Sequence, residues 1–556
     1  MADTRIYAPH SSNRHKSRGS RALGLIASLI AVACLLPMVA VALAAVTGGT
    51  DTVAHLFATV LPRYGLTTLV LVVLVAGGTF AIGVGAAWLV TMTRFPGVRV
   101  LEIALVLPMA FPAYVLAYAY TYVLDHPGIV QATLRDVTGW GPRDYWFPEI
   151  RSLGGAAVML ILVLYPYVYL LARAAFLQQS ATAFLAARAL GNNALQAFWN
   201  VSLPMARPAI AAGVLLAVME TIADFGTVAY FGVQTFATGI YTSWISMGDR
   251  GGAAQLALVL LAFALVLAIA ERSQRGRAKY HSAGKAHMSL PPADLKGWQA
   301  GLALTLCVIP VLLGFLLPVL ILSSMGLESE QNLLSRRYLQ FLTNSLTLAG
   351  IAAVVTVLAA ISVGFFQRLR PGRKSAVTGY VARLGYAVPG GVIAVGLMVP
   401  FAMFDNALDA WMRATFDIST GLLITGSIWL LVLAYMVRFL AAALGAYEGG
   451  QAMVHANMDA AARSLGETPL GTLRRVHLPI LTPSLLTALL IVFVDVMKEL
   501  PATLIMRPFN YDTLAIQAYR LASDERLEGA AVPSLVIVAV GLLPVILICR
   551  QVGRRK

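Results

Sequence analysis

The sequence predicts an all-α polytopic membrane protein with about twelve transmembrane helices in two six-helix repeats. Three observations support this fold class. The 556 residues are 59% hydrophobic and only 12% charged, about half the charged share of a soluble domain. The apolar residues occur in blocks of roughly twenty, the length that crosses a bilayer as a helix. Finally, one short polar segment occurs twice, at the same place relative to those blocks.

We expect each apolar block to form one spanning helix, because strands of a membrane barrel are shorter and alternate in polarity. The blocks are 22–46, 66–92, 101–123, 154–177, 208–230, 255–271, 298–323, 341–366, 380–403, 424–446, 483–505 and 531–549. Ala42-Leu43-Ala44 at the end of the first block resembles a signal-peptide cleavage site. The block is longer than an ordinary signal core of about 7–15 residues, so we expect it to remain as the first helix.

The net charge of +15 raises the question of nucleic-acid binding. If the N-terminus is cytoplasmic, most Lys and Arg residues fall in cytoplasmic loops, which is the positive-inside pattern and also places the C-terminus in the cytoplasm. Because these residues are spread over separate loops, we expect a lipid bilayer and no nucleic acid as a partner. Cys34, Cys307 and Cys549 lie in separate apolar blocks, which favours neither a disulfide nor a metal site.

The domain organisation follows from the longest polar cytoplasmic segment, residues 272–297, which is basic. We predict a first six-helix repeat over 1–271, this linker, and a second repeat over 298–556. Six helices return the chain to its starting side, so the repeats are parallel and a pathway is expected between them. Pairs of prolines in matching blocks (Pro108 and Pro112; Pro389 and Pro400) are expected to kink or open those helices, with ordinary packing as the alternative.

The repeated polar segment is called the cassette below. It reads Ala186-Ala187-Arg188-Ala189-Leu190-Gly191 and, eleven residues later, Leu203-Pro204; the second copy reads Ala461-Ala462-Arg463-Ser464-Leu465-Gly466 and then Leu478-Pro479. Its alanine-rich part favours a helix, and the glycine allows a left-handed turn where that helix ends. A second short helix should follow, with the proline in the first turn of the next membrane helix. The loops that carry the cassettes span 178–208 and 447–482.

Paired acids follow each cassette inside the next apolar block. They are Glu220 and Asp224 in the first half, and Asp495 and Glu499 in the second. Residues four apart share a helix face, and acids near the bilayer midplane usually face a cavity or a partner. We expect these four to line a substrate pathway, with structural pairing between helices as the alternative. Their oxygens suit a hard cation, and contact with it should be transient because transport requires release.

The cassette resembles the EAA loop of permease subunits of binding-protein-dependent ABC importers. That pattern is Glu-Ala-Ala, three residues, Gly, nine residues, Ile, one residue, Leu-Pro. Leu185 and Ala460 stand where the pattern has Glu, whereas Val201 and Val476 fill the Ile position. The stretches 223–232 and 498–503 resemble the ferric-iron branch of the family. Thiamine and phosphonate permeases share the fused layout.

The resemblance implies a type I ABC importer permease fold in a bacterial inner membrane. It implies two copies of an ABC ATPase at the cytoplasmic loops and a periplasmic substrate-binding protein. The ATPase-coupling residues that it implies are Ala186, Ala187, Gly191, Leu203, Pro204, Ala461, Ala462, Gly466, Leu478 and Pro479. The chain has no Gly-x-x-x-x-Gly-Lys-Ser/Thr loop to hold ATP phosphates. We therefore expect ATP and Mg to bind the partner, and this chain to be a transport subunit, not an enzyme, with no bound cofactor.

Three alternatives remain open at the level of sequence. The first keeps the importer but moves thiamine or another organic cation, which the acids fit nearly as well. The second is a proton-coupled secondary transporter that uses the acids as a proton relay and leaves the cassettes unexplained. The third is a membrane sensor without transport, which leaves the paired acids unexplained.

Overall fold

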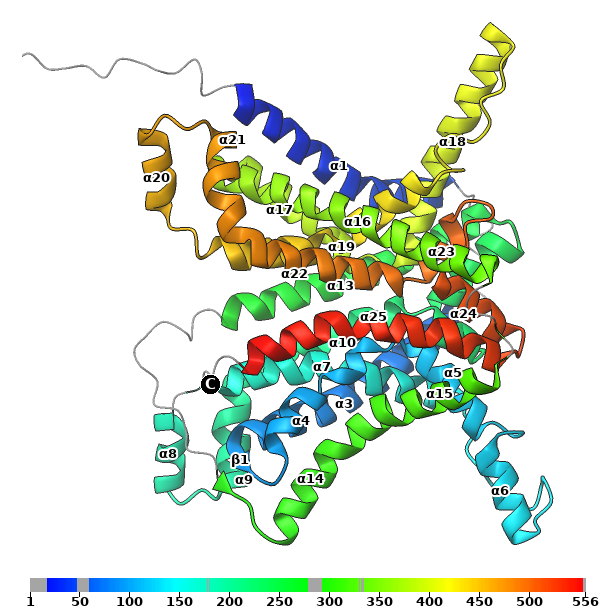
Figure 1. Cartoon of the computed structure of the whole chain (residues 1–556), viewed down its shortest axis with the longest axis vertical. Helices are drawn as coiled ribbons and strands as arrows, with labels where there is room; N and C mark the ends of the chain where they lie inside the picture. Colours follow the sequence, from blue (N-terminus) through cyan, green and yellow to red (C-terminus); the bar gives the residue numbers. More distant parts are fainter. Residues whose placement is uncertain are drawn as a thin grey trace, which may run out of the picture.

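The computed structural model of the chain is a bundle of long helices (Figure 1), and it describes residues 18–47, 60–177, 179, 181–278, 293–329, 331 and 335–553. Within these residues, eleven helices are long and apolar enough to span a bilayer. The segments Val98–Ala110 and Ala113–Thr138, bent by 92° against each other, make a twelfth span if counted together. The predicted fold class is therefore confirmed.

The first half contains the following elements: α1 (Arg18–Thr47), α3 (Leu61–Met92), β1 (Thr93–Arg94), α4 (Val98–Ala104), η1 (Leu107–Ala110), α5 (Ala113–Leu124), α6 (Ile129–Thr138), α7 (Leu153–Leu177), α8 (Ala181–Ala189), α9 (Ala194–Ala197), η2 (Phe198–Ser202), α10 (Leu203–Ala223), α11 (Gly226–Tyr230), α12 (Phe236–Tyr241), η3 (Thr242–Ser246) and α13 (Arg250–Ala278). Because α13 continues to Ala278, the start of the predicted linker is helical. Residues 279–292 of that linker lie outside the described residues.

The second half contains these elements: β2 (Ala293–Asp294), α14 (Trp298–Val311), η5 (Leu312–Leu316), α15 (Leu317–Glu328), α16 (Arg336–Leu369), α17 (Arg373–Leu384), η6 (Gly385–Ala387), α18 (Gly390–Phe416), α19 (Ile428–Gln451), α20 (Ala456–Ser464), α21 (Pro469–Thr472), η7 (Leu473–His477), α22 (Leu478–Met497), α23 (Pro501–Met506), α24 (Leu514–Ser523) and α25 (Leu527–Gly553). The strands β1 and β2 pair in parallel and join the beginning of this half to the first half.

The first helix of each half packs on the other half (Figure 1). Helix α1 contacts α16, α17 and α18 of the second half as well as α13 of its own half, whereas α14 contacts α3 and α4, and α15 contacts α5 of the first half and α25 of its own half. The crossings are close: a Cβ on Gly396 of α18 would lie 2.3 Å from the backbone oxygen of Pro37 in α1. Gly314 in η5 makes another close crossing, because a Cβ there would lie 3.0 Å from the backbone oxygen of Leu162 in α7. The first helix of each half therefore also forms part of the packing of the other half.

Several apolar blocks are broken helices. Pro112 and Pro389 are the N-cap residues of α5 and α18, so two of the predicted prolines open the chain between helices. Proline fits there because the first residues of a helix need no donor. The block 380–403 consequently begins in α17, and the spanning helix is α18, which continues through Pro400. The opening expected at these prolines is therefore confirmed, whereas the expectation that each block forms one continuous helix was wrong for these segments.

Both cassettes lie at the same end of the bundle, the end at which α1 begins and α25 finishes, with α20 and α21 well apart from α8 and α9 (Figure 1). Gly191 and Gly466 have φ of +91° and +82°, the left-handed turn that the sequence predicts. Pro204 and Pro479 lie in the first turn of α10 and α22, as predicted, although the helical backbone runs on from the cassette, so that Leu195–Ala223 and Pro469–Met497 are each one continuous helical segment. A π-helical turn precedes each proline, and its wider winding accommodates a residue without an N–H.

Candidate functional site

The site is built from two matching helix breaks. Helix α10 ends at Ala223 and α11 begins at Gly226, whereas α22 ends at Met497 and α23 begins at Pro501. Asp224 and Glu499 lie in these breaks, one turn beyond Glu220 and Asp495. The expectation that each acid pair shares one helix face was therefore wrong, because the helix ends before the second acid.

Asp224 holds the start of α11. Its carboxylate accepts hydrogen bonds from the backbone N–H groups of Thr227 and Val228, both at 3.2 Å, and from the Thr227 hydroxyl at 3.0 Å. The first N–H groups of a helix have no partner within the helix, so a carboxylate there satisfies them and interacts favourably with the helix dipole. Asp224 therefore has the structural role that was the alternative reading, in addition to its place in the cavity described below.

Glu499 caps the start of α23 in the same way. Its carboxylate accepts from the N–H groups of Ala502 at 3.0 Å and Thr503 at 3.1 Å, and from the Thr503 hydroxyl at 2.7 Å. It also pairs with Arg438 of α19, at 3.3 Å between Nη1 and Oε1. The Glu499 side chain is only 2% exposed, and a charge so buried requires this compensation.

The inner acids remain within their helices. Asp495 forms an ion pair with Lys498, one turn later, at 2.9 Å. Glu220 accepts a long hydrogen bond of 3.5 Å from the hydroxyl of Tyr386, which lies in η6 of the other half. Among the described residues, the ion pairs found at this site both involve second-half acids.

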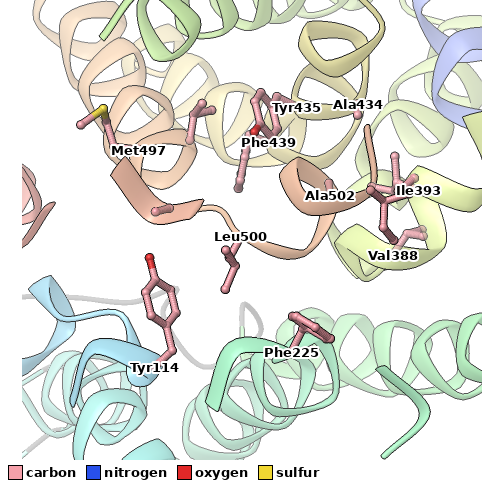
Figure 2. Packing of buried hydrophobic residues seen from close by; sticks show 14 of the residues in the cluster. Tyr114, Phe225, Val388, Ile393, Ala434, Tyr435, Phe439, Met497, Leu500 and Ala502 are labelled. Atoms are coloured by element: carbon pink, nitrogen blue, oxygen red, sulfur yellow. The ribbon is translucent and has the colours of Figure 1, made fainter. Parts of the chain in front are cut away.

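The four acids line one cavity of about 150 Å³ between the halves. Four acids and only two bases, Arg438 and Lys498, are among its lining residues, so the cavity carries an excess of negative charge. Figure 2 shows Tyr114 of the first half pointing toward the segment of Leu500, and its hydroxyl donates to the backbone oxygen of Lys498 at 3.4 Å. The cavity thus lies at the seam where the predicted pathway was expected.

Sequence reasoning missed part of this lining. Tyr114, Tyr167 and Tyr386 contribute phenol groups, and Arg438 contributes a charge from the middle of an apolar block. A basic residue inside such a block is a recognisable signal, since intramembrane charges mark pathways and partners. In the described part of the chain, no group of three or more His, Cys, Asp or Glu side chains lies close enough to hold a metal ion.

The cassettes form a second candidate site. Ala187 and Ala462 are buried at matching positions, and the first short helix of each cassette packs on the second. Leucines at matching positions point outward: Leu190 and Leu465 are each 84% exposed. Leu195 and Leu470 are exposed as well. Sequence analysis did not single out these leucines, although exposed apolar groups at a repeated position are typical of a protein-docking surface.

A bundle of spanning helices in two halves, with a polar cavity between them and a repeated cassette in each, is the architecture of a multi-pass membrane protein. Residues 79–277 match the family of binding-protein-dependent transport system inner membrane components, which supports a location in the inner membrane.

Three relatives show how far the similarity extends. The Fe(3+)-transport system permease protein FbpB 2 of Haemophilus influenzae is 26% identical over 541 residues, which cover 95% of this chain and 97% of that protein. The ferric transport system permease protein FbpB of Actinobacillus pleuropneumoniae is 25% identical over 80% of this chain and 64% of its own length. The molybdenum transport system permease protein ModB of Escherichia coli is 28% identical over 190 residues, 33% of this chain and 80% of that protein.

Proposed function

We propose that the permease imports ferric iron, which a periplasmic binding protein delivers and an ATPase partner drives. The observation that carries this proposal is the cavity between the halves, whose lining includes four acids and two bases. Carboxylate and phenol oxygens suit a hard cation, and the charge excess disfavours an anion. The similarity to ferric permeases over most of the chain supports the same cargo.

The acids have different parts in this proposal. Asp224 and Glu499 hold the two helix breaks, so they shape the cavity more than they bind cargo. Glu220 and Asp495 belong to helices whose backbone groups are already satisfied, and their carboxylates face the cavity. A site without a complete ligand cage binds a cation weakly enough to release it, which transport requires.

The cassettes are proposed to bind two copies of the ATPase in the cytoplasm, one on each. Their exposed leucines provide apolar contact, and both cassettes lie at the same end of the bundle (Figure 1). This assignment places both chain termini in the cytoplasm. ATP and Mg would be held by the partner, and the energy of ATP binding would reach the cavity through α10 and α22, which continue from the cassettes.

The test is uptake of labelled ferric iron by vesicles that contain the complete transporter with its binding protein and ATP. We expect Glu220→Gln to lower uptake at least about tenfold, because a charge about 4 Å from a cation contributes up to about 4 kcal/mol at an effective dielectric of about 20. Asp495→Asn should lower it less, since Lys498 already neutralises this acid. Glu328→Gln, at the end of α15 and outside the cavity, is the control.

The alternatives predict other outcomes in the same vesicles. Unchanged uptake in Glu220→Gln would move the acids to a purely structural role. Uptake of labelled thiamine, but not of labelled ferric iron, would favour the organic-cation importer. Uptake that follows a proton gradient without ATP would overturn the importer and favour a secondary transporter.

A further inference from the structure

Asp459 lies beside the position at which the second cassette departs from its family pattern. Ala460 stands where the pattern has Glu, and Asp459 precedes it in the first turn of α20. The carboxylate of Asp459 faces the bundle. Its Oδ2 accepts from Nε of Arg368 at 2.7 Å, and its Oδ1 lies 2.7 Å from Nε2 of His477.

These two partners belong to two different membrane helices. Arg368 is in the last turn of α16, and its second guanidinium arm donates to the backbone oxygen of Val454 at 2.8 Å. His477 is the N-cap residue of α22, is fully buried, and packs edge-on against Phe365 of α16 at 5.2 Å between ring centroids. One carboxylate therefore joins α20, α16 and α22.

The surroundings of the Asp459 carboxylate favour its ionised form. Partial burial acts to raise the pKa of Asp459, but the hydrogen bonds from His477 and Arg368 outweigh it and lower the pKa below its ordinary value. The group is thus ionised at neutral pH, and its bonds are charge-assisted and directional.

The first cassette is attached by different chemistry. Phe184 occupies the position that matches Asp459 under the repeat offset, and Ser202 matches His477. Phe184 packs on Trp88 of α3 at 5.9 Å between ring centroids, and Trp88 also contacts Phe198 at 4.5 Å. Aromatic packing of this kind holds elements together but tolerates sliding, unlike a forked ion pair.

We propose that Asp459 is a positioning residue that fixes the second cassette to the first turn of α22, so that motion of this cassette is transmitted to Asp495 at the other end of that helix. This inference rests on the proposed docking of an ATPase at the cassettes. It also accounts for Ala460 at the Glu position of the pattern, because the acid of the second cassette, Asp459, pairs with residues of the same chain.

The experiment compares transport per ATP hydrolysed in vesicles of the complete transporter. We expect Asp459→Ala to keep the ATPase bound and hydrolysing while transport per ATP falls about tenfold, within the usual range of coupling between sites. Arg368→Gln should show the same defect, and the double variant should be no worse than either alone. Glu467→Gln is the matched control, since Glu467 pairs only with the exposed Arg475 of its own cassette among the described residues.

Each outcome tests either the positioning role of Asp459 or the proposed import function. An unchanged transport-to-ATP ratio in Asp459→Ala would overturn the positioning role while leaving the importer intact. If the unaltered protein shows no ATP-driven transport, the proposed function itself fails. If Asp459→Ala does not assemble, Asp459→Asn decides the question, because it keeps the side-chain size and loses the charge: a normal ratio in it would overturn the inference.

Discussion

The two sides of the cavity carry acids at matching positions but differ in counter-charge. On the second-half side, Lys498 pairs with Asp495 and Arg438 pairs with Glu499. On the first-half side, Ala223 stands at the position that matches Lys498, and Glu220 is held by a tyrosine hydroxyl. The repeat therefore sets where the acids lie, and residues outside the repeated pattern decide how much of their charge a passing cation meets.

Removing Glu499 should have the largest effect on stability. We expect Glu499→Ala to lower the free energy of unfolding by about 3–5 kcal/mol, because Arg438 is left buried without its partner. Asp224→Ala, at the matching break, should cost only about 1 kcal/mol, the usual cost of a lost helix cap. Denaturant unfolding in detergent measures both, and equal losses would contradict the difference between the two sides.

Each half has a further ion pair between matching helices with acid and base in the opposite order, and in these pairs only Arg173 and Glu448 stand at matching positions. Arg173 of α7 pairs with Glu102 of α4, whereas the matching position in α19 is Glu448, which pairs with Arg383 of α17. The first pair is about 10% and 9% exposed, the second 30% and 44%. We expect Glu102→Gln to cost about 3 kcal/mol of unfolding free energy and Glu448→Gln less than about 1 kcal/mol.

The double reversal Glu102→Arg with Arg173→Glu sharpens this comparison. It gives the first half the charge order of the second, so it should recover most of the stability that Arg173→Glu alone removes. Thermal unfolding of the three variants checks this. A double variant no better than the single one would show that burial of the first pair depends on its orientation.

A smaller effect than that of Glu499→Ala separates two neighbouring glycines at the start of α18. A Cβ on Gly390 would lie 2.2 Å from Nη1 of Arg438 and 2.6 Å from Oε1 of Glu499, whereas one on Gly391 would meet only Ile240 at 4.0 Å. Gly390→Ala should therefore cost about 1–3 kcal/mol, as overpacking does, and Gly391→Ala should be tolerated. Unfolding midpoints in detergent measure the difference, and equal midpoints would remove the steric argument.

The sequence carried the positions of the spanning helices, the two cassettes and the four acids, because apolar length and repeat spacing are local signals. The helix breaks at Asp224 and Glu499 were not predicted. A signal was present, since each acid is followed within four residues by a threonine and Pro501 fits a first helical turn. Arg438 and the three tyrosines of the cavity come from other helices, and their approach depends on packing that no local pattern encodes.

The exchange of the first helices sets an order of events during synthesis. Helix α1 ends at Thr47, but α16, on which it packs, begins only at Arg336. At roughly 5–20 residues per second, tens of seconds separate the synthesis of α1 from that of α16, although α13, its partner in the first half, is made earlier. Neither half has its complete set of neighbours until most of the chain has been translated. The two halves therefore cannot fold one after the other, and a chain that ends midway would leave α1 without its packing partners in the second half.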